Sequence, residues 1–128
     1  MSTWLTEQWV ATVLAESGDL AGPSTLSGRI QVDVTGGDDG DTAFSLEFAG
    51  GKLVGSAMGP GDAPDAVLTL TDVDAQAVLA GDLDSSVAFM QGRMKVAGDM
   101  AIVLDLLAMS ATDDARASRS RIAAATAG

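Results

Sequence analysis

Two carboxylates spaced two positions apart, Asp72 and Asp74, are the side chains best placed for general acid–base chemistry. The chain contains no His and no Cys, which excludes a His general base, a thiol nucleophile and a Cys/His metal site. Both acids follow Thr71 at the spacing of a helix N-terminus, where the helix dipole stabilises negative charge. Helix capping explains them better than catalysis. We therefore expect no enzymatic activity, no cofactor and no metal.

Three further polar segments have ordinary structural explanations. Lys52 follows a glycine as in a phosphate-binding loop, but Leu46 occupies the position of that motif's first glycine. The segment 36–41 lacks the length and the terminal Glu of a calcium loop, which leaves a hairpin turn. Arg93 and Lys95 alternate with apolar residues, so we expect them on the solvated face of a strand.

The charge balance argues against nucleic acid and anionic membranes as partners. Seven Lys and Arg residues stand against 18 Asp and Glu residues, for a formal net charge of −11. Such a surface repels phosphate backbones and anionic lipids. Only residues 111–128 are not acidic overall, because three arginines outweigh two aspartates there. We expect no nucleic-acid binding and at most weak membrane contact.

The sequence carries no pattern typical of export or membrane insertion. The N-terminus has no basic residue ahead of its apolar positions, unlike a secretory signal. The most apolar run, residues 100–111, contains Asp105 and is shorter than the roughly 20 residues that cross a bilayer. We therefore expect a cytoplasmic protein. Hydrophobic residues make up 47% of the chain and aromatic residues only 4%, which predicts a folded, mainly aliphatic core.

Hydrophobic periodicity predicts an α+β domain. Apolar residues recur at helical spacing in some segments and at every second position in others. The order of these elements predicts a five-stranded, mostly antiparallel sheet with helices packed on one face. We expect a single domain over residues 1–110 and a frayed tail over 111–128. The expected helices cover residues 3–17, 71–81, 84–91 and 100–110, and the expected strands 29–34, 44–48, 52–58, 66–70 and 93–96.

Flexible and small side chains indicate an apolar cavity between the sheet and the helices. Leu53, Gly55 and Ala57 share one face of the third strand, and two of them are very small. Small residues facing a layer of helices leave room for an apolar ligand. Methionine adapts to varied apolar shapes, although ordinary core packing explains a cluster of Met equally simply. The clustered residues are Phe89, Met90, Met94, Met100 and Met109.

The last predicted helix is apolar nearly all round. On a helical wheel Met100, Val103, Leu104, Leu106 and Leu107 lie opposite Asp105. The side that carries Asp105 is mostly apolar as well. Such a helix is either packed on both sides or faces an apolar cavity.

Residues Ala88–Met100 read Ala-Phe-Met-Gln-Gly-Arg-Met-Lys-Val-Ala-Gly-Asp-Met, and the segments 65–71 and 79–83 precede them. With these segments the second half of the chain resembles the sterol carrier protein type-two domain family. The likeness is position-specific over Ala88–Met100 and extends over residues 65–107. The order and spacing of the strands in residues 28–58 are similar too. Residues 1–20 and 111–128 carry no such signal.

This resemblance implies a fold and a ligand class. The fold is a five-stranded, mostly antiparallel sheet covered by helices, with an apolar tunnel between them. Members of the family bind and transfer sterols, fatty acids, fatty acyl-CoA and phospholipids, and they are not catalysts by themselves. The chain departs from members that dock on anionic membranes, which are basic. Carried over by position, the tunnel residues would be Phe89, Met90, Met94, Val96, Met100, Val103, Leu104 and Leu107.

Two functions from different classes follow. The first is binding, and transfer, of a lipid or other apolar small molecule (a fatty acid, fatty acyl-CoA, sterol or isoprenoid) in an internal tunnel. The alternative is a protein-interaction or dimerisation module that buries the apolar last helix against a partner and binds no lipid. An enzyme that uses Asp and Glu chemistry ranks third, because no cluster of acids converges outside the helix starts.

Overall fold

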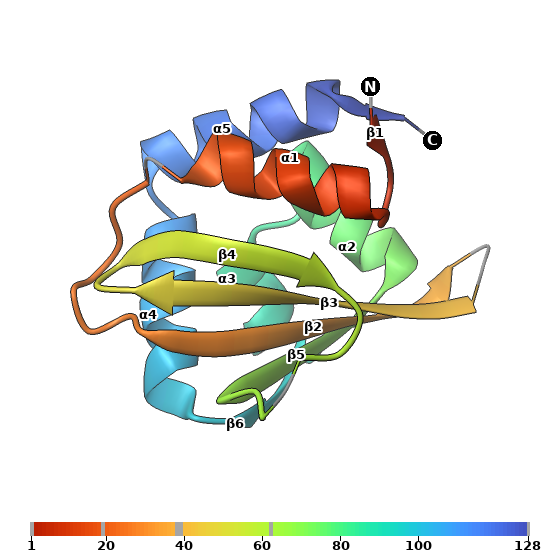
Figure 1. Ribbon diagram of the computed structural model, residues 1–128. Coiled ribbons are helices and arrows are strands. Elements are labelled where there is room, and N and C mark those ends of the chain that lie inside the picture. The colour runs from red at the N-terminus through yellow and green to blue at the C-terminus, as the bar shows by residue number, and fades with distance from the viewer. Residues whose placement is uncertain (1, 19, 38–39, 62, 128) are drawn as a thin grey trace.

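A five-stranded mixed sheet lies against five helices in the computed structural model, which describes residues 2–18, 20–37, 40–61 and 63–127 (Figure 1). The sheet order is β4-β3-β2-β5-β6, and the helices pack on one face of it. The expected α+β architecture is confirmed. The helices are α1 (Glu7–Ser17), α2 (Asp72–Ala80), α3 (Ser85–Met90), α4 (Met100–Ser110) and α5 (Asp113–Ala124). The strands are β1 (Ser2–Thr3), β2 (Gly28–Gly37), β3 (Gly40–Ala49), β4 (Lys52–Met58), β5 (Ala66–Thr71), β6 (Lys95–Gly98) and β7 (Thr126–Ala127).

The sheet is antiparallel except at its centre. Strand β5 runs parallel to β2, with Ile30 opposite Ala66 and Val34 opposite Leu70. The pairs β2–β3, β3–β4 and β5–β6 are antiparallel. In the first two pairs the strands follow each other closely in the chain, whereas α2 and α3 lie between β5 and β6. Alternate residues of β2 and β5 are buried toward the helices, which confirms the period-two pattern in the sequence. Strand β6 begins two residues later than expected.

Strand β4 differs from its expected orientation because of a β-bulge. Phe48 pairs with Leu53 and Glu47 pairs with Gly55, so one extra residue stands in β4 between them. An extra residue reverses the in–out alternation of the strand from that point. Ser56 therefore faces helix α1, where its hydroxyl donates to the Val10 carbonyl at 3.0 Å. The expectation that Gly55 and Ala57 share the helix-covered face with Leu53 is wrong.

The helix starts follow the capping chemistry of the sequence. Thr71 accepts from the Asp74 backbone N–H, and Asp99 accepts from that of Ala101, both as expected. The first helix begins at Glu7 instead of residue 3, because Thr6 caps it by accepting from the Trp9 N–H. Ser2 and Thr3 form β1, which pairs in parallel with β7 and brings the two ends of the chain together (Figure 1).

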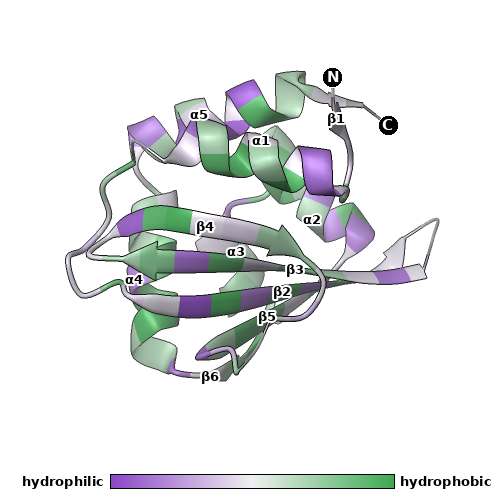
Figure 2. Ribbon diagram, in the orientation of Figure 1, coloured by the Kyte–Doolittle hydropathy of each residue, from purple (hydrophilic) through white to green (hydrophobic). Residues whose placement is uncertain are grey.

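The C-terminal segment is a packed helix, which corrects the expectation of a frayed tail. Helix α5 lies alongside α1, with Ala115, Ser118 and Ile122 buried (Figure 1). The Ser118 hydroxyl donates to the Glu16 carbonyl at 2.8 Å and lies 3.0 Å from the Ser17 hydroxyl. Figure 2 shows why this helix is hard to predict from the sequence: α4 is hydrophobic along much of its length, whereas α5 alternates polar and apolar residues. The buried apolar residues of α5 are Ala115 and Ile122.

Candidate ligand-binding cavity

A cavity of about 230 Å³ lies between the sheet and the helices. Its floor is formed by inward-facing residues of the four strands β2 to β5, among them Val32, Phe44, Leu53 and Leu68. All four side chains are at most 9% exposed. The floor is therefore apolar and fixed in position by the sheet ladder, and it has no group that could bind by polar contacts.

Two tryptophans from the N-terminal segment line another side of the cavity. The rings of Trp4 and Trp9 pack edge to face with centroids 4.8 Å apart, and Trp9 packs similarly on Phe44 at 5.4 Å. Each indole N–H is already bonded, because Trp4 donates to Asp72 at 2.7 Å and Trp9 donates to Thr126 at 3.1 Å. With their polar atoms satisfied, the rings offer apolar surface to the cavity.

Helices α2 and α4 complete the apolar wall. Ala75 and Val78 of α2 and Leu106 and Met109 of α4 line the cavity. Helix α4 thus presents the side that carries Leu106 and Met109, while Leu104 is 54% exposed. A helix that is apolar all round gives a wheel no way to decide which side faces inward.

Of the eight residues that the resemblance assigns to the tunnel, the structure places only Met94 in the cavity lining. Val103 and Leu107 are buried in the core outside the lining, and Phe89 and Val96 pack against that core half-buried. Met90, Met100 and Leu104 are exposed on the outside of α3 and α4, with Met90 83% exposed. The Ala88–Met100 segment therefore contributes mainly to the core packed around the cavity, and only Met94 contributes to the cavity lining.

Sequence reasoning missed the walls contributed by the two ends of the chain. Trp4 and Trp9 have a signal that could have found them, since they are the only two tryptophans and begin an amphipathic segment. The α5 residues in the lining have no comparable signal, because Ala and Ser recur throughout the tail. The α5 residues in the lining are Ala115, Ser118, Arg119 and Ile122.

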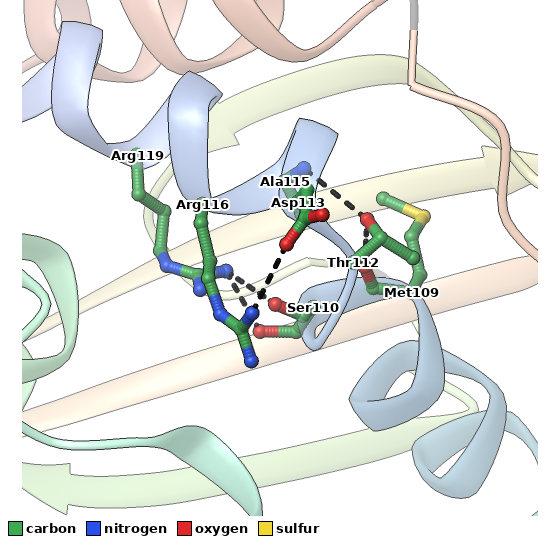
Figure 3. A network of polar contacts seen from close by, with 7 residues as sticks. All are labelled: Met109, Ser110, Thr112, Asp113, Ala115, Arg116 and Arg119. Carbon is green, nitrogen blue, oxygen red and sulfur yellow. Dashed lines mark hydrogen bonds and ion pairs between the residues drawn. The ribbon is translucent and has the colours of Figure 1, made fainter.

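The cavity lining is nearly all apolar, and Arg119 is its charged residue. Arg119 uses its Nη1 to donate to both the carbonyl and the hydroxyl of Ser110, each at 2.9 Å (Figure 3). A second pocket of about 200 Å³ is lined by Asp84, Arg116 and Arg119 among others. Leu79 and Arg119 belong to the lining of both spaces, so the apolar cavity and the polar pocket adjoin at these two side chains.

The charge of Arg119 is held in a partly desolvated position. Burial lowers the pKa of its guanidinium, and the positive charge of Arg116 lowers it further, while Asp84 raises it. An arginine stays protonated throughout the ordinary pH range in spite of such effects. Arg119 therefore carries a permanent positive charge beside the cavity.

The described residues include no cluster of three acidic side chains able to hold a metal ion. Within the same residues, each helix is too short or too polar to cross a bilayer.

Comparison with known proteins matches most of the chain to one family. The model of the SCP-2 sterol transfer family matches residues 12–109. Hydroxysteroid dehydrogenase-like protein 2 from Homo sapiens is 38% identical over 71 residues, which cover 55% of this chain but only 16% of that much longer protein. The activity of the longer protein therefore does not carry over.

Solved structures share the fold at low sequence identity. The solution structure of a conserved protein from Thermus thermophilus superposes with a TM-score of 0.75 at 20% identity, covering 96% of both chains. A crystal structure of sterol carrier protein 2 superposes with a TM-score of 0.73 at 22% identity, covering 91% of this chain and 97% of the other. At these identities the likeness establishes the architecture of the chain.

Proposed function

This chain belongs to the SCP-2 sterol transfer family, and from that premise we propose that it binds a lipid or other apolar small molecule in the cavity between sheet and helices. The observation that carries the proposal is the cavity itself, about 230 Å³ in volume and lined almost entirely by apolar side chains. Apolar cavities of this kind bind apolar molecules because water gains little by entering them. The binding role is non-catalytic, and the cytoplasmic location remains a prediction.

The volume favours a single acyl chain over a four-ring sterol. An engineered protein cavity of about 150 Å³ holds one benzene, with its six carbons, so 230 Å³ has room for about nine carbon atoms. Burial of about nine methylene groups at about 0.8 kcal/mol each contributes about 7 kcal/mol before the costs of association. A free energy of about 7 kcal/mol corresponds to a Kd of about 7 μM, so the costs of association make binding weaker than this value. A longer chain or a sterol requires the cavity to widen or to open at one end into a tunnel.

Binding is measurable without a label, because both tryptophans of the chain line the cavity. A ten-carbon chain, added as 1-decanol or decanoate below its aggregation concentration, should change the intrinsic fluorescence in a saturable way. Native mass spectrometry of freshly purified protein should in addition reveal any co-purified ligand by its mass. Failure of both ten-carbon probes to bind would contradict the proposal.

A cavity-filling variant tests where the chain binds. Ala75 lines the cavity from α2, so Ala75→Phe should weaken binding of both probes about tenfold or more while leaving thermal stability nearly unchanged. Ala108→Phe is the matched control, because Ala108 is exposed on α4 and adds the same ring outside the cavity. Equal binding by the two variants would show that the ligand lies elsewhere.

A specific observation supports the second candidate, an interaction module. Helices α3 and α4 contact each other, and their exposed apolar side chains include Met90 at 83% and Leu104 at 54% exposure. Under this reading these side chains are buried in a dimer of the chain. Sedimentation velocity decides between the two: a dimer that forms without lipid and dissociates in Leu104→Gln supports the interaction module. A monomer that binds the ten-carbon probes supports the lipid-binding proposal.

Transfer to membranes is the finer part of the proposal, and the structure supports only weak contact. Two of the arginines in the C-terminal segment already have acidic partners, Arg116 with Asp113 at 3.2 Å and Arg121 with Glu16 at 2.8 Å. The third, Arg119, lines the cavity and donates to Ser110. We therefore expect a lipid to leave by diffusion through water or by handover to a protein partner.

A further inference from the structure

The apolar cavity and the polar pocket adjoin at Leu79 and Arg119. The side chains at this boundary indicate which head group a lipid bound in the cavity would carry. An amphiphile in the cavity places its chain among the apolar side chains and its head group where the lining becomes polar. Among the residues common to both spaces, Arg119 is the charged one. The head group therefore meets a guanidinium.

The lining of the polar pocket has more basic than acidic side chains, in a protein that is strongly acidic overall. Arg116 and Arg119 line it with Asp84, although the whole chain has a net charge of −11. Arg116 pairs with Asp113, which leaves Arg119 as the cation of the pocket without an acidic partner among the described residues. The Asp84 carboxylate is already used, since one oxygen accepts the backbone N–H groups of Ser86 and Val87 at the start of α3. No ion pair joins Asp84 to Arg119 in the part of the chain that the structure describes.

Arg119 is anchored and still has donors to offer. Its Nη1 is held by two hydrogen bonds to Ser110, which fix the guanidinium at the junction between α4 and α5 (Figure 3). Arginine has five N–H donors, and the three on Nε and Nη2 have no hydrogen-bond partner among the described residues. A planar pair of free donors suits the two oxygens of a carboxylate or a phosphate.

We propose that Arg119 recognises an acidic head group, so that the preferred ligand is a single-chain amphiphile ending in a carboxylate or a phosphate. This inference rests on the proposed function, because it assigns the head group of the chain bound in the same cavity. Neutral lipids fill the apolar part equally well but give the guanidinium no anionic partner. Helix α5, which lies outside the residues matched by the family model, thereby sets the specificity.

The test compares ten-carbon chains that differ only in the head group. Decanoate, decyl phosphate and 1-decanol are titrated at neutral pH and low salt against the wild-type protein, with Trp4 and Trp9 fluorescence as the signal. We expect one of the two anions to bind about tenfold more tightly than 1-decanol, as for hydrogen bonds to charged groups. The tighter of the two anions identifies the head-group chemistry.

Two variants assign the preference to Arg119. Arg119→Gln should lose about tenfold in affinity for the preferred anion and keep its affinity for 1-decanol within about twofold, whereas Arg119→Lys should retain part of the preference. Arg121→Gln is the control, because it removes an arginine of the same helix that pairs with Glu16 outside both spaces. It should leave all three affinities unchanged.

The outcomes separate this inference from the function on which it rests. If 1-decanol binds as tightly as both anions, or if Arg119→Gln weakens all three ligands equally, the head-group assignment is wrong and cavity binding stands. If none of the three probes binds the wild-type protein, the proposed function fails and the assignment fails with it.

Discussion

The Ala88–Met100 segment and the two ends of the chain contribute to the cavity in opposite ways. The segment carries the family pattern and provides one lining residue, Met94, whereas the ends carry no pattern and provide two walls. Trp4 and Trp9 come from one end, and Arg119 and Ile122 from the other. The difference shows that the residues with the recognisable pattern mainly support the cavity, while residues without such a pattern form much of its lining.

Backbone geometry explains what the Ala88–Met100 segment is needed for. Gly98 has a φ of 98°, and a Cβ there would collide with the backbone of Asp65, directly ahead of the neighbouring strand β5. Ala88 is fully buried, and its carbonyl accepts the N–H groups of Arg93 and Met94 at 2.9 and 3.1 Å. Both positions require a small residue for close packing. The residue pattern of Ala88–Met100 is therefore explained by the packing of the fold, without reference to a ligand.

The largest expected effect is on that framework. Gly98→Ala combines a strained positive φ, about 1–3 kcal/mol, with a steric collision of similar cost, so we expect a loss of about 2–6 kcal/mol in the free energy of unfolding. Gly36→Ala is the control, since Gly36 has a φ of 72° but nothing within 4 Å of the added Cβ. Urea denaturation of both variants measures the difference, and equal stabilities would remove the packing explanation.

The next effect tests whether α5 is part of the folded domain. Ile122 is 3% exposed and lines the cavity, so Ile122→Ala should lower the free energy of unfolding by about 2–4 kcal/mol. If residues 111–128 were frayed, Ile122→Ala would leave the free energy of unfolding almost unchanged. Ala117 is exposed on the same helix, and Ala117→Gly provides a control with a cost of about 1 kcal/mol from helix propensity alone. Equal losses in the two variants would mean that α5 does not pack.

A smaller effect is expected on the outer side of α4. Leu104 is 54% exposed and outside the cavity lining, so Leu104→Gln should change the free energy of unfolding by less than about 0.5 kcal/mol. Binding of decanoate should be unaffected. A loss of binding with an intact fold would return Leu104 to the ligand site, where the resemblance alone had placed it.

The smallest effect concerns the membrane. Surface ion pairs and net repulsion leave little attraction for anionic lipid, so co-sedimentation with anionic vesicles at physiological salt should be weak. Replacing Arg116, Arg119 and Arg121 together by Ala should not change it measurably. Strong binding that increases with the anionic lipid fraction and disappears in the triple variant would make α5 a membrane-docking element.

The sequence predicts the elements of this fold well because their signals are local. Alternation in β2 and β5 and the caps at Thr71 and Asp99 depend on residues within a few positions of one another, and all are confirmed. The bulge in β4 is different, because it arises from pairing with β3 across a turn. A single inserted residue changes which side chains face inward without changing the apolar pattern of the strand.

The cavity lining is harder to predict because it depends on tertiary contacts. Nothing in an all-apolar α4 distinguishes Leu106 from Leu104, and only packing against the sheet turns Leu106 inward. The polar tail becomes a helix of the domain through a few buried contacts, such as Ser118 with Glu16 and Ser17. A run of Ala, Ser and Arg shows no periodicity strong enough to reveal them.

The central claim, that the ligand lies between the sheet and the two chain ends, is tested most directly by an NMR titration of ¹⁵N-labelled protein with decanoate. The account predicts shifts of both indole N–H signals, from Trp4 and Trp9, and of the Leu106 and Ile122 amides. The Met90 and Leu104 amides, on the outside of α3 and α4, should stay unchanged. Shifts confined to Met90 and Leu104, with both indole signals unmoved, would contradict it.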